Sequence, residues 1–527
     1  MDKTHETPQT TSSQEDLTRR CQQLEQEVET LSAKLKWYED QFRLSQQQKY
    51  GASREHTPDE QVSLFDEAEK EADVTVPEPT EEEITYKRKK QKGRRDAMLE
   101  DLPVERMEYT LEDTACPQCD GSLHVMSQEI RKEIAIIPAQ VKVVEHVRFV
   151  YTCRTCEQTA ESTPVITAPM PAPVLPGSLV SPSFMAFVMN RKYGEGLPLY
   201  RQEQQLHHFG LDISRQTLAN WMIRGSADWL EILYEELHRE LLTKDILHGD
   251  ETELQVLREE GRTAANKSYM WHYATGHTDV PIRLYEYQTT RASKHPAAFL
   301  KGFTGYLHTD GYQGYNQIPG VKVIGCWAHA RRMFTDALKV LTKEKEPTSH
   351  TKSSEGLAFC NRLFEIEREL KDRSPEERYT LRMEKSKPVL DAFLVWLKEN
   401  KRSALPKSPL GKAITYCLNQ WPRLEGILLD GRLEISNNRA ERGIKPFVIG
   451  RKNWLFANTP KGAKASAVIY SIVETAKANG LSPFHYLMYL FEKLPNMDLT
   501  DPEALKAVLP WSKSLPTSCS SGAKALV

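Results

Sequence analysis

The sequence predicts a multidomain α/β protein, and three observations support this prediction. The chain has 527 residues, several times the usual size of a domain, so we expect more than one folded unit. Two Cys-x-x-Cys pairs, one beginning at Cys116 and one at Cys153, indicate a small metal-binding unit. From about residue 245, segments with the period-two apolar pattern of strands alternate with helical segments, which is typical of an α/β core.

The composition favours soluble globular units joined by polar segments. Hydrophobic residues make up 39% of the chain and charged residues 27%, and the formal net charge is only −3. This excludes a uniformly basic nucleic-acid-binding chain. The charges are segregated, however, because residues 66–83 are rich in acids whereas residues 87–95 carry seven cations in nine positions. A basic block of this kind is usually solvated and often contacts nucleic acid.

The chain shows no sequence signal for a membrane or for secretion. No apolar run approaches the ~20 residues that span a bilayer, and the polar residues 1–17 lack the apolar segment of a signal peptide. We therefore expect a cytoplasmic protein with no membrane partner. In that compartment the nine cysteines are not expected to form a disulfide framework.

Residues 17–42 carry an apolar heptad seam, with steps of four and three residues and polar residues at the other positions. This pattern predicts an N-terminal coiled coil and hence a homo-oligomer. An amphipathic helix packed on its own chain is the alternative. The seam consists of Leu17, Cys21, Leu24, Val28, Leu31, Leu35, Tyr38 and Phe42.

The two Cys-x-x-Cys pairs predict a zinc ribbon. Each pair, Cys116 with Cys119 and Cys153 with Cys156, can direct two thiolates to one metal, and two pairs complete a tetrahedral site. Apolar and polar residues alternate between the pairs, as they do in strands. Because no ligand position is left open for water, we expect one structural Zn²⁺ and not a catalytic one. A redox function is the alternative for a Cys-x-x-Cys pair.

A Pro-rich spacer at residues 164–176 separates the ribbon from two helical patterns. Gly210 interrupts these patterns, and Ser214 can N-cap the second helix, on which Arg215 faces outward. Two short helices joined in this way predict a helix-turn-helix-like unit. An ordinary helical hairpin is the alternative.

The next segments predict three strands, a helix, two strands and a helix. This order resembles an RNase H-like core, in which three antiparallel strands lead into parallel ones. Asp250 lies in the first predicted strand, and Asp310 lies at the end of the fourth. In such a core these two acids lie side by side, and a third acid comes from a later helix.

Clustered carboxylates repel one another unless cations bind between them. Mg²⁺ prefers hard oxygen ligands, so we expect two Mg²⁺ or Mn²⁺ ions at this site. One ion lowers the pKa of an attacking water or hydroxyl, and the other stabilises the leaving 3′ oxygen of a phosphodiester. Asp245 and Glu251 compete with Asp250, but Asp245 precedes the apolar strand and Glu251 points to the opposite face.

Five segments of the chain are distinctive: HGDET (248–252), HTDGYQGY (308–315), CWAHARRMF (326–334), NNRAERGIKPFVIGRKNWLF (437–456) and SIVETAKANGLSPFHYL (471–487). Together they resemble the transposases of the insertion-sequence-66 family. The similarity extends from near Lys49 to Trp511 and includes the SLFDEAE element, the ribbon and LPLYRQE. Two departures occur, Gly249 where Ala is expected and Ser436 where Asp is frequent.

This resemblance implies a bacterial DDE transposase with an RNase H-like core, a large helical insertion and metal-dependent DNA cleavage and strand transfer. The triad carried onto this chain is Asp250, Asp310 and Glu441. The implied partners are terminal inverted repeats and target DNA, with possible accessory proteins of the same element. The protein would be nucleoid-associated when it is bound to DNA.

Glu441 lies on a predicted helix together with several cations. Ser436 can N-cap this helix, and Pro446 is expected to kink or end it. An ion pair with Lys445, four residues along the helix, is the alternative role for Glu441. The rival acids for the third position are Glu434 and Glu474.

Cations around the expected site are candidates for phosphate contacts, and solvated surface charge is the alternative for each. Trp454 and Phe456 could stack on an unpaired base, with core packing as the alternative. The candidate cations are Arg439, Arg442, Lys445, Arg451, Lys452, Arg331, Arg332 and, on the helix-turn-helix-like unit, Arg215.

The predicted organisation has nine segments. In chain order they are an N-terminal coiled-coil helix (1–48), a short DNA-binding or linker region with acidic and basic tracts (49–100), the zinc ribbon (101–163), the Pro-rich spacer (164–178), the helix-turn-helix-like helices (179–243), the first segment of the RNase H-like core (244–332), the helical insertion (333–431), the second segment of the core (432–492) and a C-terminal tail (493–527). Two other functions stay open. One is a non-catalytic zinc-ribbon DNA-binding regulator, and the other is an RNase H-like nuclease without strand transfer.

Overall fold

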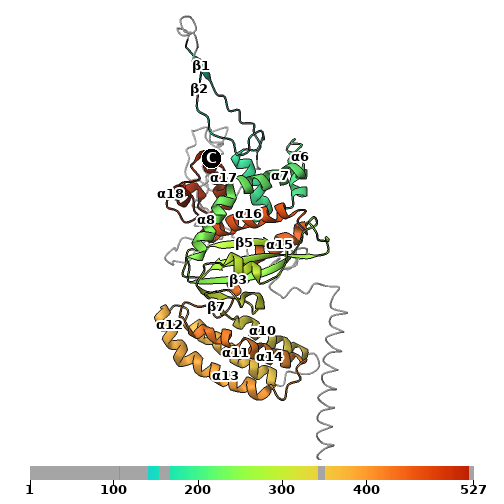
Figure 1. Ribbon diagram of the computed structural model, residues 1–527, viewed down its shortest axis with the longest axis vertical. Coiled ribbons are helices and arrows are strands. Elements are labelled where there is room, and N and C mark those ends of the chain that lie inside the picture. The colour runs from blue at the N-terminus through green and yellow to red at the C-terminus, as the bar shows by residue number, and fades with distance from the viewer. Residues whose placement is uncertain (1–105, 107–139, 154–164, 342–350, 522–527) are drawn as a thin grey trace, which may run out of the picture. The chain divides into compact units, whose positions relative to one another are not determined.

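The computed structural model describes residue 106 and residues 140–153, 165–341 and 351–521 (Figure 1). The predicted coiled coil, the acidic and basic tracts and most of the zinc ribbon lie outside these residues. No helix in the described part of the chain combines the length and the hydropathy that a bilayer span requires. The described chain forms two compact units. One is Leu230–Asn479, and the other consists of the described parts of Pro77–Trp229 and Gly480–Val527.

The first unit contains a five-stranded mixed sheet with the strand order β5-β4-β3-β6-β7. β3 (Ile246–Gln255) pairs antiparallel with β4 (Lys267–Thr275), and β4 pairs antiparallel with β5 (Arg283–Gln288). On its other side, β3 pairs in parallel with β6 (Gly305–His308), which pairs in parallel with β7 (Val321–Ile324). Three antiparallel strands therefore lead into parallel ones.

The order of elements agrees with the sequence prediction. α9 (Lys294–Phe299) separates β5 from β6, and α10 (Trp327–Leu341) follows β7. Strand β4 is buried at nearly every position, including the consecutive residues Met270 and Trp271. Consecutive side chains of a strand point to opposite faces, so both faces of the sheet are covered at β4.

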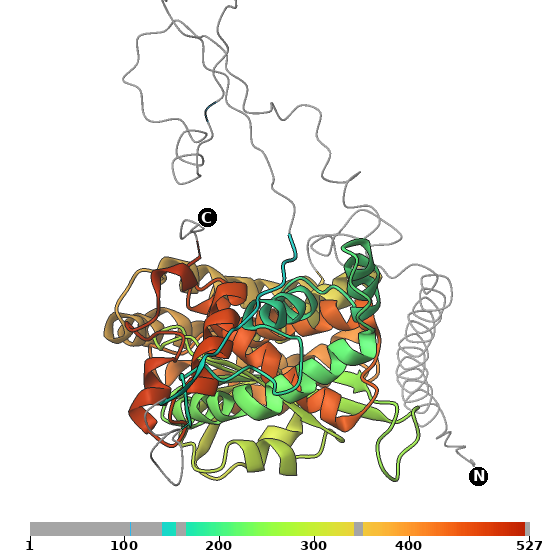
Figure 2. The same cartoon turned by 90° about the horizontal axis from the view of Figure 1, so that it is seen from above.

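The edge strand β5 is covered by α16 (Pro460–Ala478). Ser471 Oγ accepts a hydrogen bond from the main-chain N–H of Tyr285 at 2.8 Å. Thr475 Oγ1 accepts from the N–H of Arg283 and donates to its carbonyl, both at 3.0 Å. The hydroxyls of α16 thus replace a further strand and leave this edge protected. α8 (Glu231–Leu242) lies beside α16 against the same strand (Figures 1 and 2).

A helical segment lies between α10 and the last part of the sheet unit. It consists of α11 (Lys352–Glu369), α12 (Pro375–Leu381), α13 (Lys387–Asn400) and α14 (Pro409–Leu424), with short turns at Arg382–Ser386 and Glu425–Leu428. Its apolar core contains the packed rings of Trp327, Phe393 and Trp421. Trp327 Nε1 also donates to the carbonyl of Leu424 at 2.9 Å, which joins α10 to the end of α14.

The predicted N-cap of the Glu441 helix is wrong, because the N-cap residue is Asn437 instead of Ser436. α15 runs from Asn438 to Trp454, so it does not end at Pro446. Pro446 is tolerated because the carbonyl that its missing N–H would bind belongs to Arg442, which lies on the exposed side of the helix. The Asn437 side chain does not cap the helix because it binds β3, as described below.

The second unit contains α5 (Pro182–Met189), α6 (Leu199–His208), α7 (Arg215–Gly225), α17 (Pro483–Lys493) and α18 (Pro502–Ala507). Ser214 caps α7 as predicted, with its hydroxyl accepting from the N–H of Thr217 at 3.2 Å. Ahead of these helices, β1 (Val150–Thr152) pairs antiparallel with β2 (Val165–Thr167). β2 lies at the start of the predicted Pro-rich spacer, so the beginning of the spacer is a paired strand and not a free extended chain.

Candidate active site

Asp250 and Asp310 lie at matching positions just beyond the paired stretch of the parallel strands β3 and β6. In the register of β3 and β6, His248 stands opposite His308. Asp250 and Asp310 each follow these histidines by two residues, so both acids come just after the end of this paired stretch. Asp310 begins a turn in which its Oδ1 accepts from the N–H of Tyr312 at 2.9 Å.

Glu441 lies in the first turn of α15, which packs against β3 and β4. Its Oε1 atom is buried and has no hydrogen-bond partner among the described residues. His329 Nδ1 lies 3.7 Å from Oε1, and Arg332 Nη2 lies 3.8 Å from Oε2. Within the described chain no ion pair joins Glu441 to Lys445, so the geometry does not favour the surface-pair alternative.

The environment of Asp250 opposes its negative charge. The pKa of Asp250 is raised to about 8, first by burial and then by the charges of Glu251 and Asp310, with a smaller contribution from Glu441. A hydrogen bond of 2.8 Å from the N–H of Glu251 to Asp250 Oδ1 acts in the opposite direction. Asp310 and Glu441 therefore both lie close enough to Asp250 to oppose its negative charge.

These residues fit divalent cations with a preference for oxygen ligands. Three carboxylates that repel one another, one of which has a buried oxygen without a partner among the described residues, form a site that is more stable with a cation than without one. Mg²⁺ and Mn²⁺ both take carboxylate ligands. Asp250, Asp310 and Glu441 are the residues that would hold them.

The two rivals of Asp250 have other partners. Asp245 is exposed and accepts from Arg432 Nη1 at 2.7 Å. Glu251 lies on the opposite face of β3 from Asp250, as predicted, and its side chain is 1% exposed. It accepts from Arg291 Nε and from the Tyr315 hydroxyl, both at 2.7 Å. Both acids are therefore used in ion pairs or hydrogen bonds.

The two rivals of Glu441 are also engaged. Glu434 lies in the loop before α15 and accepts from Arg439 Nε at 2.7 Å. Glu474 lies on α16, where it pairs with Lys477 at 2.9 Å and with Arg283 of β5 at 3.5 Å. Neither of them is among the charges that shift the pKa of Asp250.

Asn437 connects the start of the Glu441 helix to the strand of Asp250. Its buried side chain donates from Nδ2 to the carbonyl of Gly249 at 2.9 Å, and its Oδ1 lies 3.1 Å from His248 Nδ1. Its main-chain N–H donates to Cys326 Sγ at 3.1 Å, and its carbonyl accepts from the N–H of Glu441 at 3.2 Å. One residue thus holds β3, α10 and α15 together.

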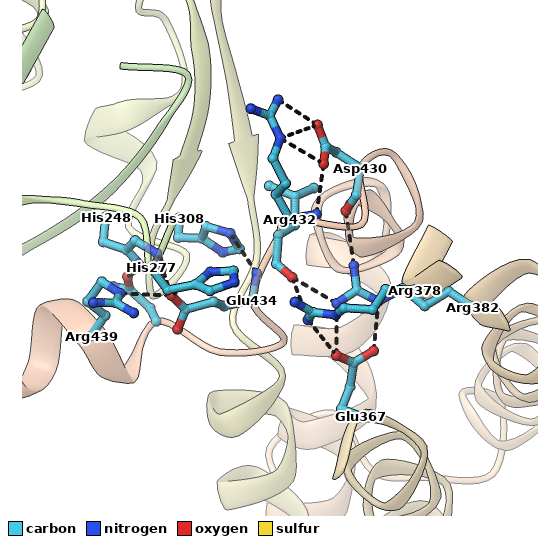
Figure 3. A network of polar contacts seen from close by, with 12 residues as sticks. His248, His277, His308, Glu367, Arg378, Arg382, Asp430, Arg432, Glu434 and Arg439 are labelled. Carbon is cyan, nitrogen blue, oxygen red and sulfur yellow. Dashed lines mark hydrogen bonds and ion pairs between the residues drawn. The ribbon is translucent and has the colours of Figure 1, made fainter. Parts of the chain in front are cut away.

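Two buried histidines, His248 and His308, precede Asp250 and Asp310 by two residues each. The rings of His248 and His308 stack with centroids 4.5 Å apart and planes 10° apart. Burial, followed by repulsion from His248, lowers the pKa of His308 well below its ordinary value, so His308 is neutral. Figure 3 shows Glu434 beside both rings, with its Oε1 3.5 Å from His248 Nε2 and its N–H donating to His308 Nε2 at 3.4 Å.

The helical segment supports the loop of Asp310. The Tyr416 hydroxyl donates to the carbonyl of Asp310 at 3.0 Å, and Gln420 Nε2 donates to that of Gly311 at 3.3 Å. Gly311 has a φ of +102°, and a side chain there would meet Gln420 at 3.2 Å. The turn after Asp310 therefore depends on glycine and on contacts from α14.

A second support holds the loop before α15 (Figure 3). Arg382 is fully buried and donates to both carboxylate oxygens of Glu367, at 2.7 and 2.8 Å. It also donates to the carbonyls of Ile427 and Asp430, both at 3.0 Å, and of Leu433 at 2.8 Å. The guanidinium thereby fixes the path of the chain that leads to Asn437 and Glu441.

Comparison with known families accounts for this arrangement. A family model described as the transposase IS66 family matches residues 177–465, more than half of the chain. The chain belongs to the IS66 transposase family. Further models match the zinc-finger binding domain of transposase IS66 at residues 113–157, the IS66 C-terminal element at 471–511, and the transposase C of IS166 homeodomain at 37–107.

Related proteins of similar length occur in Sinorhizobium fredii (strain NBRC 101917 / NGR234). The protein y4jD is 30% identical over 416 residues, which are 76% of this chain and 78% of y4jD. The protein y4hP is 29% identical over 427 residues, 77% of this chain and 75% of y4hP. The similarity therefore covers most of each protein and not a single shared domain.

The IS66 family membership confirms the resemblance that the sequence motifs indicated, and it identifies the chain as a DDE transposase with a zinc finger. The zinc-finger match spans all four predicted zinc ligands. Of these four, Cys153 is the one that lies in the described part of the chain, where it is exposed. Cys116, Cys119 and Cys156 lie outside the described residues.

The candidate cations of this IS66 transposase fall into two groups. Arg439, Arg451 and the exposed Arg332 lie beside other parts of the protein, namely Glu434, Thr252 Oγ1 (3.2 Å) and Glu441 respectively. The others are exposed and form no ion pair within the described chain: Arg442, Lys445, Lys452, Arg331 and, in the second unit, Arg215.

The aromatic candidates also differ from each other. Trp454 packs against Phe447 inside α15, with ring centroids 5.6 Å apart, which agrees with core packing. Phe456 is 43% exposed just after the helix.

The sequence did not reveal Tyr416, Gln420 or Arg382, because nothing in the local sequence marks a residue that supports a distant site. The sequence did contain a signal for Asn437, because Asn437 precedes Glu441 by one helical turn and so shares its face of the helix.

Proposed function

We propose that this IS66 transposase has an RNase H-like core and cleaves and joins DNA through Asp250, Asp310 and Glu441. The observation that carries this proposal is the placement of the two aspartates just beyond the paired stretch of β3 and β6, Asp250 within β3 and Asp310 after β6, with Glu441 supplied by a helix packed on β3. The sheet order, with three antiparallel strands followed by two parallel ones, supports the RNase H-like assignment.

The three carboxylates would hold two Mg²⁺ or Mn²⁺ ions. When bound, such ions activate the attacking oxygen and stabilise the leaving 3′ oxygen of a phosphodiester. The protein contributes the placement of the ligands. β3 and β6 fix the two aspartates relative to each other, Asn437 fixes α15 against β3, and Tyr416 holds the turn of Asp310. Water is the nucleophile for cleavage, and the freed 3′ hydroxyl is the nucleophile for strand transfer.

DNA binding rests on several regions of the chain. The exposed cations Arg442, Lys445, Lys452 and Arg331 lie on the helices that carry or neighbour Glu441, where they can contact phosphates of the terminal inverted repeats and of target DNA. Arg215 begins α7 and is a separate candidate.

The segments outside the described residues have predicted roles of their own. We propose that Cys116, Cys119, Cys153 and Cys156 hold one structural Zn²⁺, and that the N-terminal heptads form a homo-oligomer. Accessory proteins of the same element are possible partners. If a Cys116→Ser protein kept its full zinc content, this would contradict the proposed zinc ribbon.

The test of function uses labelled DNA that ends in the inverted repeat of the element, incubated with the full-length protein and Mg²⁺. Nicked and joined products are expected. Asp250→Asn is expected to abolish both products and to leave DNA binding intact, because it removes a metal ligand and no phosphate contact. Asp245→Asn is the matched control from the residue just before β3, since Asp245 is exposed and paired with Arg432.

Each alternative function has its own outcome in this assay. Clear binding of the repeat without any cleavage would favour the non-catalytic regulator. Cleavage without joined product would favour the nuclease. Cleavage that survives Asp250→Asn would overturn the assignment of the triad.

A further inference from the structure

A second set of metal-binding atoms lies on the side of Glu441 that faces α10. Cys326 Sγ, a ring nitrogen of His329 and a carboxylate oxygen of Glu441 all lie within 4.8 Å of one another. Cys326 directly precedes α10 and His329 lies in its first turn, and this places the thiol and the imidazole beside each other. Glu441 reaches them from α15.

Two of these ligand atoms lack the hydrogen bonds that buried polar atoms normally make. His329 Nδ1 and Glu441 Oε1 are both buried, 3.7 Å apart, and neither has a hydrogen-bond partner among the described residues. A buried polar atom without a partner destabilises the protein by about 1–3 kcal/mol. Two such atoms that face each other at a separation too long for a hydrogen bond are suited to share one bound ion, which would satisfy both.

Main-chain N–H groups surround the sulfur and would support a metal-bound thiolate. Cys326 is fully buried, and its Sγ accepts from the N–H of Asn437 at 3.1 Å. Burial raises the pKa of the Cys326 thiol above its ordinary value, and hydrogen bonds from the main-chain N–H groups of Asn437, His329 and Ala328 offset only part of this increase. Main-chain N–H groups at the start of a helix stabilise a thiolate, and a metal ion completes this stabilisation.

We propose that Cys326, His329 and Glu441 form a binding site for a transition-metal dication of the Zn²⁺ class. Sulfur and imidazole nitrogen select Zn²⁺ or Co²⁺ over Mg²⁺, which prefers oxygen ligands throughout. Three protein ligands leave a fourth position open for water or a phosphate oxygen. The site therefore differs in chemistry from the carboxylate site of Asp250 and Asp310, although it shares Glu441 with it.

The two metal sites share Glu441, and this has a consequence for activity. The consequence rests on the proposed function of the carboxylate site in DNA cleavage. A Zn²⁺ ion bound to Cys326 and His329 takes Glu441 Oε1 away from the Mg²⁺ site. Zn²⁺ is thus expected to inhibit DNA cleavage in the presence of Mg²⁺, and a chelator is expected to restore it.

The binding test uses the full-length protein and Co²⁺ as the probe. Wild-type protein is expected to bind one Co²⁺ with a thiolate-to-cobalt charge-transfer band. The zinc content is measured before and after the titration, so that exchange in the ribbon is recognised. Cys326→Ser is expected to lose the band, and Cys360→Ala, which changes a buried thiol elsewhere in the helical segment, is expected to keep it.

His329→Gln provides a second variant if Cys326→Ser does not fold, because the side chain of His329 is 25% exposed. It is expected to weaken Co²⁺ binding at least about tenfold and to raise the Zn²⁺ concentration needed for inhibition by a similar factor. The proposal is overturned if wild-type protein binds no Co²⁺ beyond the ribbon, or if both variants bind it like wild type. Co²⁺ binding in a protein that cannot cut DNA would refute the proposed function and leave this site standing.

Discussion

Asn437 is joined to Gly249 by a hydrogen bond of 2.9 Å from its side-chain amide to the main-chain carbonyl, although the two residues are 188 positions apart in the sequence. Gly249 directly precedes Asp250, and Asn437 precedes Glu441 by one helical turn. The hydrogen bond therefore sets the spacing between two of the three proposed metal ligands. A change at Asn437 alters this spacing without removing any carboxylate.

Asn437→Ala is expected to raise the Mg²⁺ concentration for half-maximal cleavage by about 10–100-fold, because residues that orient ligands affect metal affinity by factors of this size. Saturating Mn²⁺ is expected to restore part of the activity. Asn438→Ala is the matched control, since the neighbouring Asn438 is partly exposed and its side chain makes no hydrogen bond within the described chain. An unchanged Mg²⁺ dependence in the Asn437 variant, together with a simple loss of folded protein, would reduce Asn437 to a structural role.

The raised pKa of Asp250 predicts a pH-dependent stability in the absence of divalent metal. An aspartate titrates near 3.9 in the unfolded chain but near 8 here, so the folded state binds more protons between these values. The stability that this difference contributes is complete below about pH 4 and is lost as the pH rises through about 8. The contribution of Asp250 therefore makes the metal-free protein less stable as the pH rises from about 4 to about 8.

Asp250→Asn removes this loss, because an amide does not ionise. The free energy of unfolding of the variant minus that of wild type is expected to grow by up to about 4 kcal/mol from pH 5 to pH 8. Urea unfolding at both pH values, with a chelator present, measures it. Adding Mg²⁺ should reduce the difference at pH 8. A difference that does not change with pH would show that Asp250 ionises normally in the folded protein.

Arg382 gives a prediction about stability and not about chemistry. Arg382→Met removes two hydrogen bonds to the buried Glu367 carboxylate and those to the carbonyls of Ile427, Asp430 and Leu433, whereas Arg378 Nη2 still donates to Glu367 at 3.2 Å. The expected loss is smaller than the about 3–5 kcal/mol of a fully broken buried ion pair, because Arg378 keeps Glu367 paired. Thermal or urea unfolding of the full chain tests this.

The double variant Arg382→Met with Glu367→Leu separates the two causes. It is expected to recover only part of the loss, because the buried carboxylate is gone but Arg378 loses Glu367 as its partner. Arg373→Met is the exposed control, since Arg373 and Glu377 are both more than half exposed, and it is expected to change stability by less than about 1 kcal/mol. If the double variant is no more stable than the single one, the charge of Glu367 is not the reason for the loss.

Local patterns in the sequence were sufficient to predict the strands. They were not sufficient to predict contacts between residues far apart in the sequence. The alternation around Asp250 and the short apolar strand before Asp310 predicted β3 and β6, because each strand shows its own period. The end of the Glu441 helix could not be predicted, since whether Pro446 ends it depends on the exposure of the residue one turn earlier. The strand period alone placed Glu251 on the opposite face from Asp250, whereas its partners Arg291 and Tyr315 come from distant positions and could not be predicted.

The exposed cations of α15 give a prediction about DNA affinity. Arg442 and Lys445 are exposed and form no ion pair within the described chain, so replacing both with Gln removes two phosphate contacts and no internal one. The slope of log K against log salt concentration is expected to fall in magnitude by about one for each residue, equally for specific and unrelated DNA. Lys301→Gln with Lys322→Gln, two exposed lysines on other elements, is the control. Equal slopes for wild type and the α15 variant would place the DNA backbone elsewhere on the protein.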